Sequence, residues 1–193
     1  MTTMFGMFEG CSSLTTINMA EMEILEVTTM NSMFLDCENL QSVNMTGVTT
    51  PKVVSTDSTF DGCKALSTVA VEDGTFGNVT DAEYMFRDCQ NYTFAEAGQM
   101  DFSNVANARN MFQRCYKLTE EAIESMNFSS VTDAYYMFAE CTGLNDTLIL
   151  ALPSVVNAAY LFYGCENLDA LDISSFGTSV DLSQMLGGCS RLS

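Results

Sequence analysis

The stretch VTDAYYMFAEC at residues 131–141 is almost the same as VTDAEYMFRDC at residues 79–89, and both copies end on a cysteine. The two cysteines lie 52 positions apart, twice the distance between most neighbouring cysteines of the chain. The chain has eight cysteines, with successive spacings of 26, 26, 26, 26, 26, 24 and 24 residues. A fixed period between about 20 and 50 residues is the signature of a solenoid or a related repeat array.

The cysteines themselves are predicted to form a structural ladder with one rung in each repeat. Its members are Cys11, Cys37, Cys63, Cys89, Cys115, Cys141, Cys165 and Cys189. Cysteine is small and readily buried, so we expect buried free thiols. Disulfides between repeats are the first alternative, but stacked side chains about 4.8 Å or more apart exceed the usual Cβ separation of about 3.5–4.5 Å. A chain of metal-bound thiolates is the second alternative.

The residues before each cysteine have a helical apolar pattern. Counted from ten residues before the cysteine, apolar side chains recur at offsets 0, 3, 6, 7, 10 and 13. At about 100° per residue these positions fall within one arc of roughly 140°. Offset 2 always carries a residue type that caps helix N-termini, namely Thr3, Thr29, Ser55, Asp81, Asn107, Asp133, Asn157 and Asp181. The pattern predicts a short capped helix in each repeat.

After each cysteine the apolar period changes from helical to two. LTTINM (14–19), LQSVNM (40–45), LSTVAV (66–71) and LDALDI (168–173) alternate as a half-buried strand does. Stacking the repeats would align these strands into a parallel sheet on one face and the helices on the other. The sequence therefore predicts an α/β, leucine-rich-repeat-like solenoid of eight repeats of 24–26 residues, forming one repeat domain over residues 1–193.

The motif C-x-x-L-x-x-hydrophobic-x-hydrophobic, followed by V-T-x-[M/A]-x-x-M-F-x-x-C, resembles the BspA-like leucine-rich-repeat surface proteins. DFSNVANARNMFQRC (101–115) and MNFSSVTDAYYMFAEC (126–141) are close to that family's repeat. The resemblance implies a solenoid that serves adhesion or has no assigned activity, at a cell surface or outside the cell. The family has no defined catalytic residues, so none are carried over.

Composition excludes several classes of function. The chain has 25 acidic and 7 basic residues and a net charge of −18, which disfavours binding to nucleic acid or anionic lipid. This charge fits either simple solubility or a basic partner or divalent cation. Histidine is absent, which excludes Ser-His and Cys-His nucleophile pairs and histidine-based metal sites. We expect no enzyme, no cofactor, no metal site and no membrane insertion, and no signal peptide in the segment MTTMFGMFEGC.

Candidate binding residues are those expected to point outward from the strand face, because solenoids usually bind partners there. They are Thr16, Asn18, Ser42, Asn44, Thr68, Phe94, Glu96, Asp101, Asn127 and Asp172. Phe94 is the one large apolar member. The alternative is that it turns inward, because its repeat has Tyr92 in place of the usual Leu and its strand segment (YTFAEAG) is irregular. The pairs Glu72–Asp73 and Glu120–Glu121 could suggest acid–base chemistry, but they are expected to face water.

Two functions remain open from the sequence alone. The first is recognition or adhesion by a segment of a longer repeat array, with the strand face binding a protein or glycan. The second is structural: Met1 already occupies the first slot of a repeat and Ser193 stops where a strand would begin. Open repeat ends could stack head to tail into filaments.

Overall fold

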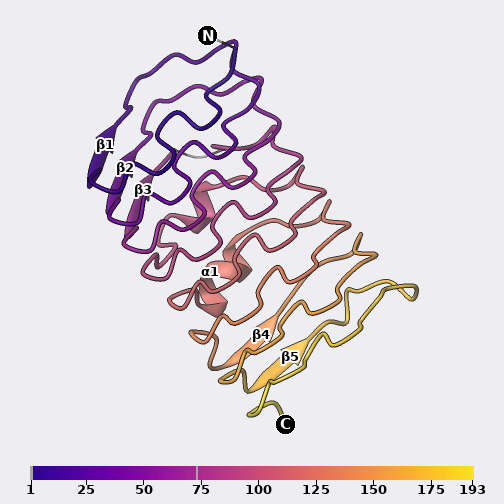
Figure 1. Cartoon of the computed structure of the whole chain (residues 1–193). Coiled ribbons are helices and arrows are strands. Elements are labelled where there is room, and N and C mark those ends of the chain that lie inside the picture. The colour runs from indigo at the N-terminus through magenta and orange to yellow at the C-terminus, as the bar shows by residue number, and fades with distance from the viewer. Residues whose placement is uncertain (1, 73) are drawn as a thin grey trace.

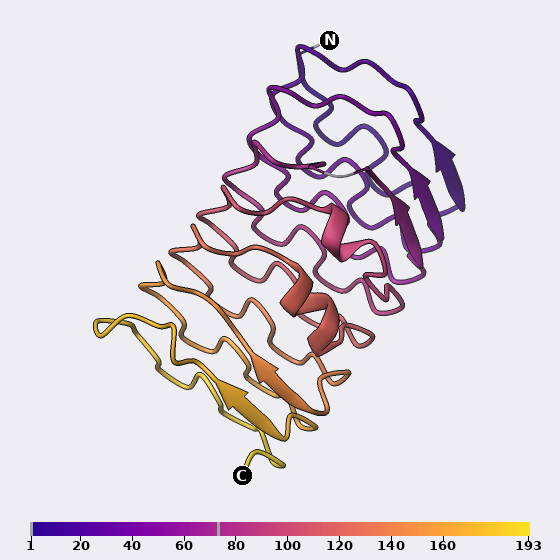
Figure 2. The same ribbon diagram turned by 180° about the vertical axis from the view of Figure 1, so that it is seen from behind.

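The computed structural model describes residues 2–72 and 74–193, which wind into a stack of coils running from the N-terminal to the C-terminal end (Figure 1). The regular elements are few and short, and seen from behind they follow one another along the stack (Figure 2). They are β1 (Thr16–Asn18), β2 (Ser42–Asn44), β3 (Thr68–Ala70), η1 (Ala97–Gln99), α1 (Glu120–Ser125), β4 (Thr147–Ile149) and β5 (Ala170–Asp172).

Strands β1, β2, β3 and β5 lie within the predicted alternating segments, whereas β4 lies outside them, and the strands pair in parallel between neighbouring coils. Thr16 faces Ser42, which faces Thr68, so the 26-residue period becomes the strand register. The strands β4 and β5 form a second parallel pair. The leucine-rich-repeat-like solenoid with parallel strands is thus confirmed. The sheet is not continuous, however, because η1 and α1 occupy the strand side of the fourth and fifth coils.

The predicted helix before each cysteine is wrong. From residue 30 to Cys37 the chain makes three consecutive tight turns, in which the N–H groups of Met33, Leu35 and Cys37 each donate to the carbonyl three residues earlier. The N–H groups between them donate to the next coil instead; that of Phe34, for example, bonds the Thr59 carbonyl at 2.9 Å. A helix would satisfy all of these donors within the segment, whereas here half of them hold two coils together.

Left-handed backbone enforces this turn path. Two residues in every coil have positive φ, one and five positions before the cysteine; in the sixth coil they are Tyr136 (φ 54°) and Glu140 (φ 60°). Positive φ at the third residue of a turn is the requirement of type II turns, and it interrupts a right-handed helix. We call the surface made by these segments the turn face; it comprises residues 4–11, 30–37, 56–63, 82–89, 108–115, 134–141, 158–165 and 182–189.

The predicted helix-capping side chains still accept hydrogen bonds from the following backbone, but they precede turns instead of helices. Asp133 Oδ1 accepts a hydrogen bond from the Tyr135 N–H at 3.1 Å, and Asn157 Oδ1 accepts one from the Ala159 N–H at 3.1 Å. Such contacts two residues along the chain are Asx turns, which these side chains form outside helices as well. Residues at this position pair in parallel with their equivalents from Thr29 to Asp181 and thereby link successive coils.

One hydrophobic core runs the length of the stack. Its centre is a column of stacked phenylalanine rings with centroids 5.4–5.8 Å apart, formed by Phe8, Phe34, Phe60, Phe86, Phe112, Phe138 and Phe162. Fully burying each such side chain contributes roughly 1.5–3 kcal/mol to stability. Because each ring between the two ends of the column stacks on the rings above and below it, the core favours continuous stacking of coils.

Salt bridges also join neighbouring coils. Six of the seven basic side chains pair with a carboxylate 22 to 26 positions away, among them Lys52 with Glu26 and Arg191 with Asp169. The most buried pair is Arg87 with Asp61, whose side chain is only 5% exposed, at 2.6 Å. Burial raises the pKa of Asp61 while Arg87 opposes that rise. The basic residues therefore act mainly within the chain.

Candidate functional site

The strand face places the first five predicted binding residues in two rows. Thr16, Ser42 and Thr68 form one row across β1–β3, and Asn18 and Asn44 form the other. Between the rows, the central residue of each strand points into the core, as Val43 does at 1% exposure. This alternation leaves a narrow polar strip on the outside of the sheet.

Several of the predicted polar residues already bond their own backbone. The Oδ1 atoms of Asn18 and Asn44 accept from the N–H two residues on, at 3.1 and 3.0 Å. Asp101, Asn127 and Asp172 do the same at 2.8–3.0 Å. The Ser174 backbone and hydroxyl lower the pKa of Asp172, so this residue is a carboxylate at neutral pH. The Asx side chains are therefore held in fixed orientations, with only part of their hydrogen-bonding capacity free for a ligand.

The structure corrects one predicted site residue and shifts another. Phe94 is 1% exposed and packs edge-on between the core rings of Phe86 and Phe112, each 5.3 Å away, so it cannot bind a ligand at the surface. Glu96 is half-buried at the start of η1, and its carboxylate accepts from the Tyr92 hydroxyl at 3.3 Å. Both changes arise because η1 lies at the place that a strand occupies in the first three coils.

Helix α1 replaces the strand of the fifth coil. Thr119 caps its N-terminus by accepting from the Ala122 N–H, and the segment LTEEAIESM carries acidic residues in the first turn. These signals were present in the sequence and could have located the helix, because acidic first turns and Thr caps are typical of helix starts.

Two carboxylates of α1 accept the hydrogen bonds that a strand in the fifth coil would otherwise accept. Glu120 Oε1 accepts from the N–H groups of Asn145 (2.6 Å) and Asp146 (2.9 Å), and Glu124 Oε1 accepts from the Ile149 N–H (3.1 Å). These donors belong to β4 and the residues leading into it, which would otherwise lack a partner on this side. Glu120 is therefore engaged in holding the fold, contrary to the acid–base use that the Glu120–Glu121 pair could suggest.

Between α1 and the coil of β4 lies a groove of about 600 Å³ that sequence reasoning missed. Ile123, Met126, Phe128, Ile149, Leu150 and Pro153 contribute its apolar lining. Ile149 is 61% exposed, unusually high for a large apolar side chain. Among these side chains, Ile149 and Pro153 supply the accessible apolar surface of the groove, because Ile123, Met126, Phe128 and Leu150 are at most 8% exposed.

The cysteine ladder has a uniform geometry. All eight cysteines are free, six are buried, and Cys11 is exposed. From Cys37 onward, each sulfur lies 3.0–3.2 Å from the carbonyl oxygen of the phenylalanine 27 or 29 positions earlier, to which the thiol donates. Burial raises the pKa of these thiols, that of Cys141 to about 12. Protonated thiols are poor nucleophiles and poor metal ligands.

Within residues 2–72 and 74–193, no group of three or more Cys, Asp or Glu side chains is arranged to hold a metal ion. None of the helices in the described part of the chain is both long enough and apolar enough to cross a membrane.

The coil stack, its parallel strands and its polar strand face define a leucine-rich-repeat solenoid, a fold that generally serves as a module for protein interaction. The chain belongs to the family described as "Mycoplasma protein of unknown function, DUF285", whose model matches residues 1–95 and 80–193. This agrees with the expected BspA-like, leucine-rich-repeat character.

Among solved structures, the chain is similar to a leucine-rich-repeat protein of T. pallidum. The TM-score is 0.65 at 20% identity, over 93% of this chain and 78% of that one. A leucine-rich-repeat protein from Bacteroides ovatus aligns at 16% identity over 99% of this chain and 69% of the other, with a TM-score of 0.31 that is too low to support an argument. No curated protein matches the chain. The T. pallidum likeness confirms the fold and nothing finer.

Proposed function

We propose that the protein is a non-enzymatic recognition module that works at a cell surface and binds a protein or glycan through its strand face. The observation that carries the proposal is the groove of about 600 Å³ beside α1, because an exposed apolar hollow next to ordered polar groups is what binding sites offer. Thr16, Ser42 and Thr68 would supply hydroxyl contacts at the other end of the same face. The leucine-rich-repeat fold supports the interaction role.

A non-enzymatic role is supported by how the acidic residues are used. Glu120 uses one carboxylate oxygen to accept hydrogen bonds from two backbone N–H groups, and the other candidate pair, Glu72–Asp73, includes Asp73, which lies outside the described residues. The buried thiols are protonated and hydrogen-bonded to carbonyl oxygens, which leaves them unsuited to nucleophilic attack.

The binding test compares Ile149→Glu with Val156→Glu. Ile149 lines the groove at 61% exposure, and Val156, at 60%, lies outside it, so the two β-branched residues match in exposure and charge change and differ in size by one methylene. Labelled chains would be applied to a glycan array and to cultured epithelial cells before and after protease treatment. Ile149→Glu should reduce binding at least tenfold and Val156→Glu less than twofold. Equal losses, or no binding to either target, would contradict the proposal.

The same preparations decide between recognition and assembly. Light scattering and negative-stain imaging at micromolar concentration should show particles of one chain's mass. Fibres with an axial repeat near the length of the stack would instead favour head-to-tail stacking as the function.

A further inference from the structure

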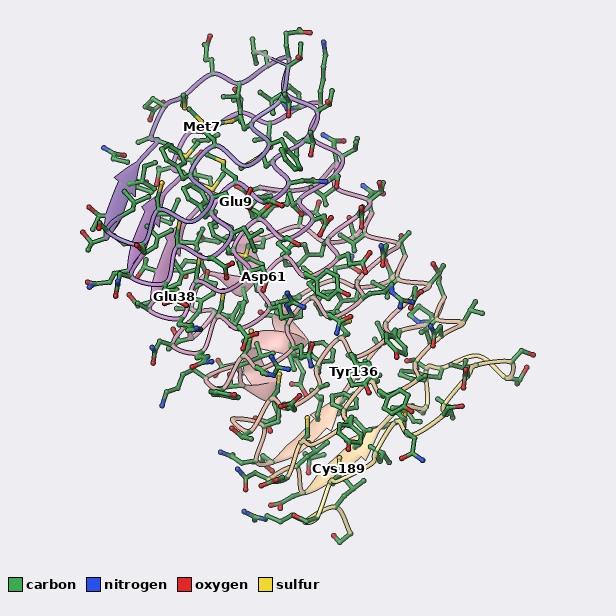
Figure 3. The ribbon with its side chains drawn as sticks, viewed as in Figure 1. Met7, Glu9, Glu38, Asp61, Tyr136 and Cys189 are labelled. Atoms are coloured by element: carbon green, nitrogen blue, oxygen red, sulfur yellow. The ribbon has the colours of Figure 1, made fainter. Side chains whose placement is uncertain are left out.

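The turn face carries a cluster of tyrosines that the strand-face proposal does not use. Tyr136, labelled in Figure 3, stacks on Tyr160 with ring centroids 4.5 Å apart and planes within 7°. Tyr135 meets both rings edge-on, and Tyr163 is tilted against both at 6.1 and 5.7 Å. Stacking fixes these rings in place while leaving them partly exposed. The result is a firm aromatic surface on the sixth and seventh coils.

Next to this cluster lies a hollow of about 460 Å³, which we call the tyrosine cleft. Its lining includes Tyr116, Glu140, Thr142, Tyr163, Gly164 and Glu166. The two tyrosines are 36% and 40% exposed, so their rings are accessible to a ligand.

Glycine makes room for the cleft. The position before the cysteine carries Arg114 in the fifth coil and Glu140 in the sixth, but Gly164 and Gly188 in the next two. A Cβ atom at Gly164 would lie 3.2 Å from Cγ of Glu140, so any side chain there would press on the cleft wall. Side chains are thus missing where the two preceding coils have long ones.

Elsewhere on the turn face, arginine side chains of the chain itself already lie over a tyrosine ring and pair with a carboxylate. Arg109 lies 4.5 Å from the centre of the Tyr135 ring and pairs with carboxylates of Glu83 and Asp133 at 3.5 and 3.0 Å. Arg87 lies 4.4 Å from the centre of the Tyr84 ring while pairing with Asp61. A tyrosine ring with a carboxylate beside it is therefore a working guanidinium site in this fold.

Two carboxylates line the tyrosine cleft: Glu140 pairs with Arg114, whereas Glu166 forms no ion pair within residues 2–72 and 74–193. From residue 118 to 193 the chain has ten acidic residues and one basic residue, Arg191, which pairs with Asp169. Arg114 reaches Glu140 at 3.3 Å but also pairs with Asp88, on the side away from Gly164. Glu166, which also lines the cleft, is exposed.

We infer that the tyrosine cleft binds a guanidinium group, supplied by an arginine side chain of a partner protein. The planar group would stack on a tyrosine ring and donate to the carboxylate of Glu166, as Arg109 does within the chain. A net charge of −18 favours a basic segment as the source of that arginine. This surface is separate from the strand face, so its test is independent of the one above.

The test uses the full chain and two synthetic peptides, acetyl-Gly-Arg-Gly-amide and its citrulline counterpart, which has the same shape without the charge. Titrations are followed by NMR of the tyrosine ring signals. The arginine peptide should shift the signals of Tyr116 and Tyr163 saturably and bind at least fivefold more tightly than the citrulline peptide. Equal binding of the two peptides, or shifts spread evenly over all tyrosines, would overturn the inference.

Variants distinguish binding at the tyrosine cleft from non-specific attraction to the acidic surface of the chain. Glu166→Gln should weaken binding of the arginine peptide at least threefold, whereas Glu121→Gln, an equal charge change on α1, should weaken it less than 1.5-fold. Thr142→Arg, which places a guanidinium in the cleft from within, should abolish the tyrosine shifts. Urea midpoints identify any variant that fails to fold. Equal effects of Glu166→Gln and Glu121→Gln would mean non-specific attraction and would refute the site.

Discussion

Phe112→Ala should destabilise the protein more than the same change anywhere near the ends of the phenylalanine column. Phe112 is fully buried and has five aromatic neighbours with ring centroids 5.3–6.4 Å away: Phe86, Phe94, Phe102, Phe128 and Phe138. Truncating a buried phenylalanine costs about 3–5 kcal/mol. Each ring pair adds about 0.5–1.5 kcal/mol beyond area burial. We therefore expect a loss of about 4–5 kcal/mol, near the top of the range.

Phe8→Ala is the matched control, because Phe8 is only partly buried and stacks on one ring, Phe34, at 5.4 Å. Its truncation should cost about 1–2 kcal/mol. Urea unfolding in the presence of reductant, followed by circular dichroism and tyrosine fluorescence, measures both. A Phe112→Ala loss no greater than that of Phe8→Ala would refute the idea that the column stabilises the stack through its central rings.

Three other perturbations test the inter-coil contacts. Arg87→Met should cost roughly 2 kcal/mol at pH 7 because it leaves the buried Asp61 carboxylate without its ion-pair partner. Lys52→Met removes a pair in which both side chains are more than half exposed, so it should leave the urea midpoint nearly unchanged; similar midpoints for the two variants would contradict this. Glu120→Ala should cost about 1 kcal/mol because two backbone N–H groups lose their acceptor, while Glu121→Ala on the same turn should be nearly neutral in the same measurement. Burial raises the pKa of Cys141 from 9.0 to about 12, so its contribution to stability is complete below pH 9 and is lost as the pH rises from 9 toward 12. Cys141→Ala should accordingly reduce the alkaline slope of the unfolding free energy by about 1.4 kcal/mol per pH unit, and an unchanged slope would show that this thiol titrates normally in the folded chain.

Much of the fold follows from the repeat pattern. The 26-residue period predicts the register of β1–β3, since Thr16, Ser42 and Thr68 are equivalent positions. The alternating segments correctly place apolar residues such as Val43 inside. The pattern is less informative where a coil departs from it: Phe94 turns into the core, and α1 takes the place of a strand.

The candidate site could be predicted only in part. The polar rows of the strand face follow from alternation, but the groove beside α1 requires a helix and a strand from different coils to meet. The tyrosine cleft likewise depends on small residues of one coil lying beside large ones of another, as Gly164 does beside Glu140. Such pairs lie 24 to 26 positions apart, beyond the reach of local pattern rules.

The sequence by itself determined which positions of the regular repeat are buried and that equivalent positions stack, because residue type and spacing follow from burial and period. Only the tertiary structure decided how the backbone before each cysteine runs. The apolar spacing of residues 30–37 suits a helix, and the Thr29 side chain caps its own chain either way. Half of the N–H groups nevertheless bond carbonyl oxygens of the next coil. Those acceptors come into reach only when the coils are stacked, so the turn path is a property of the assembled solenoid and not of any single repeat.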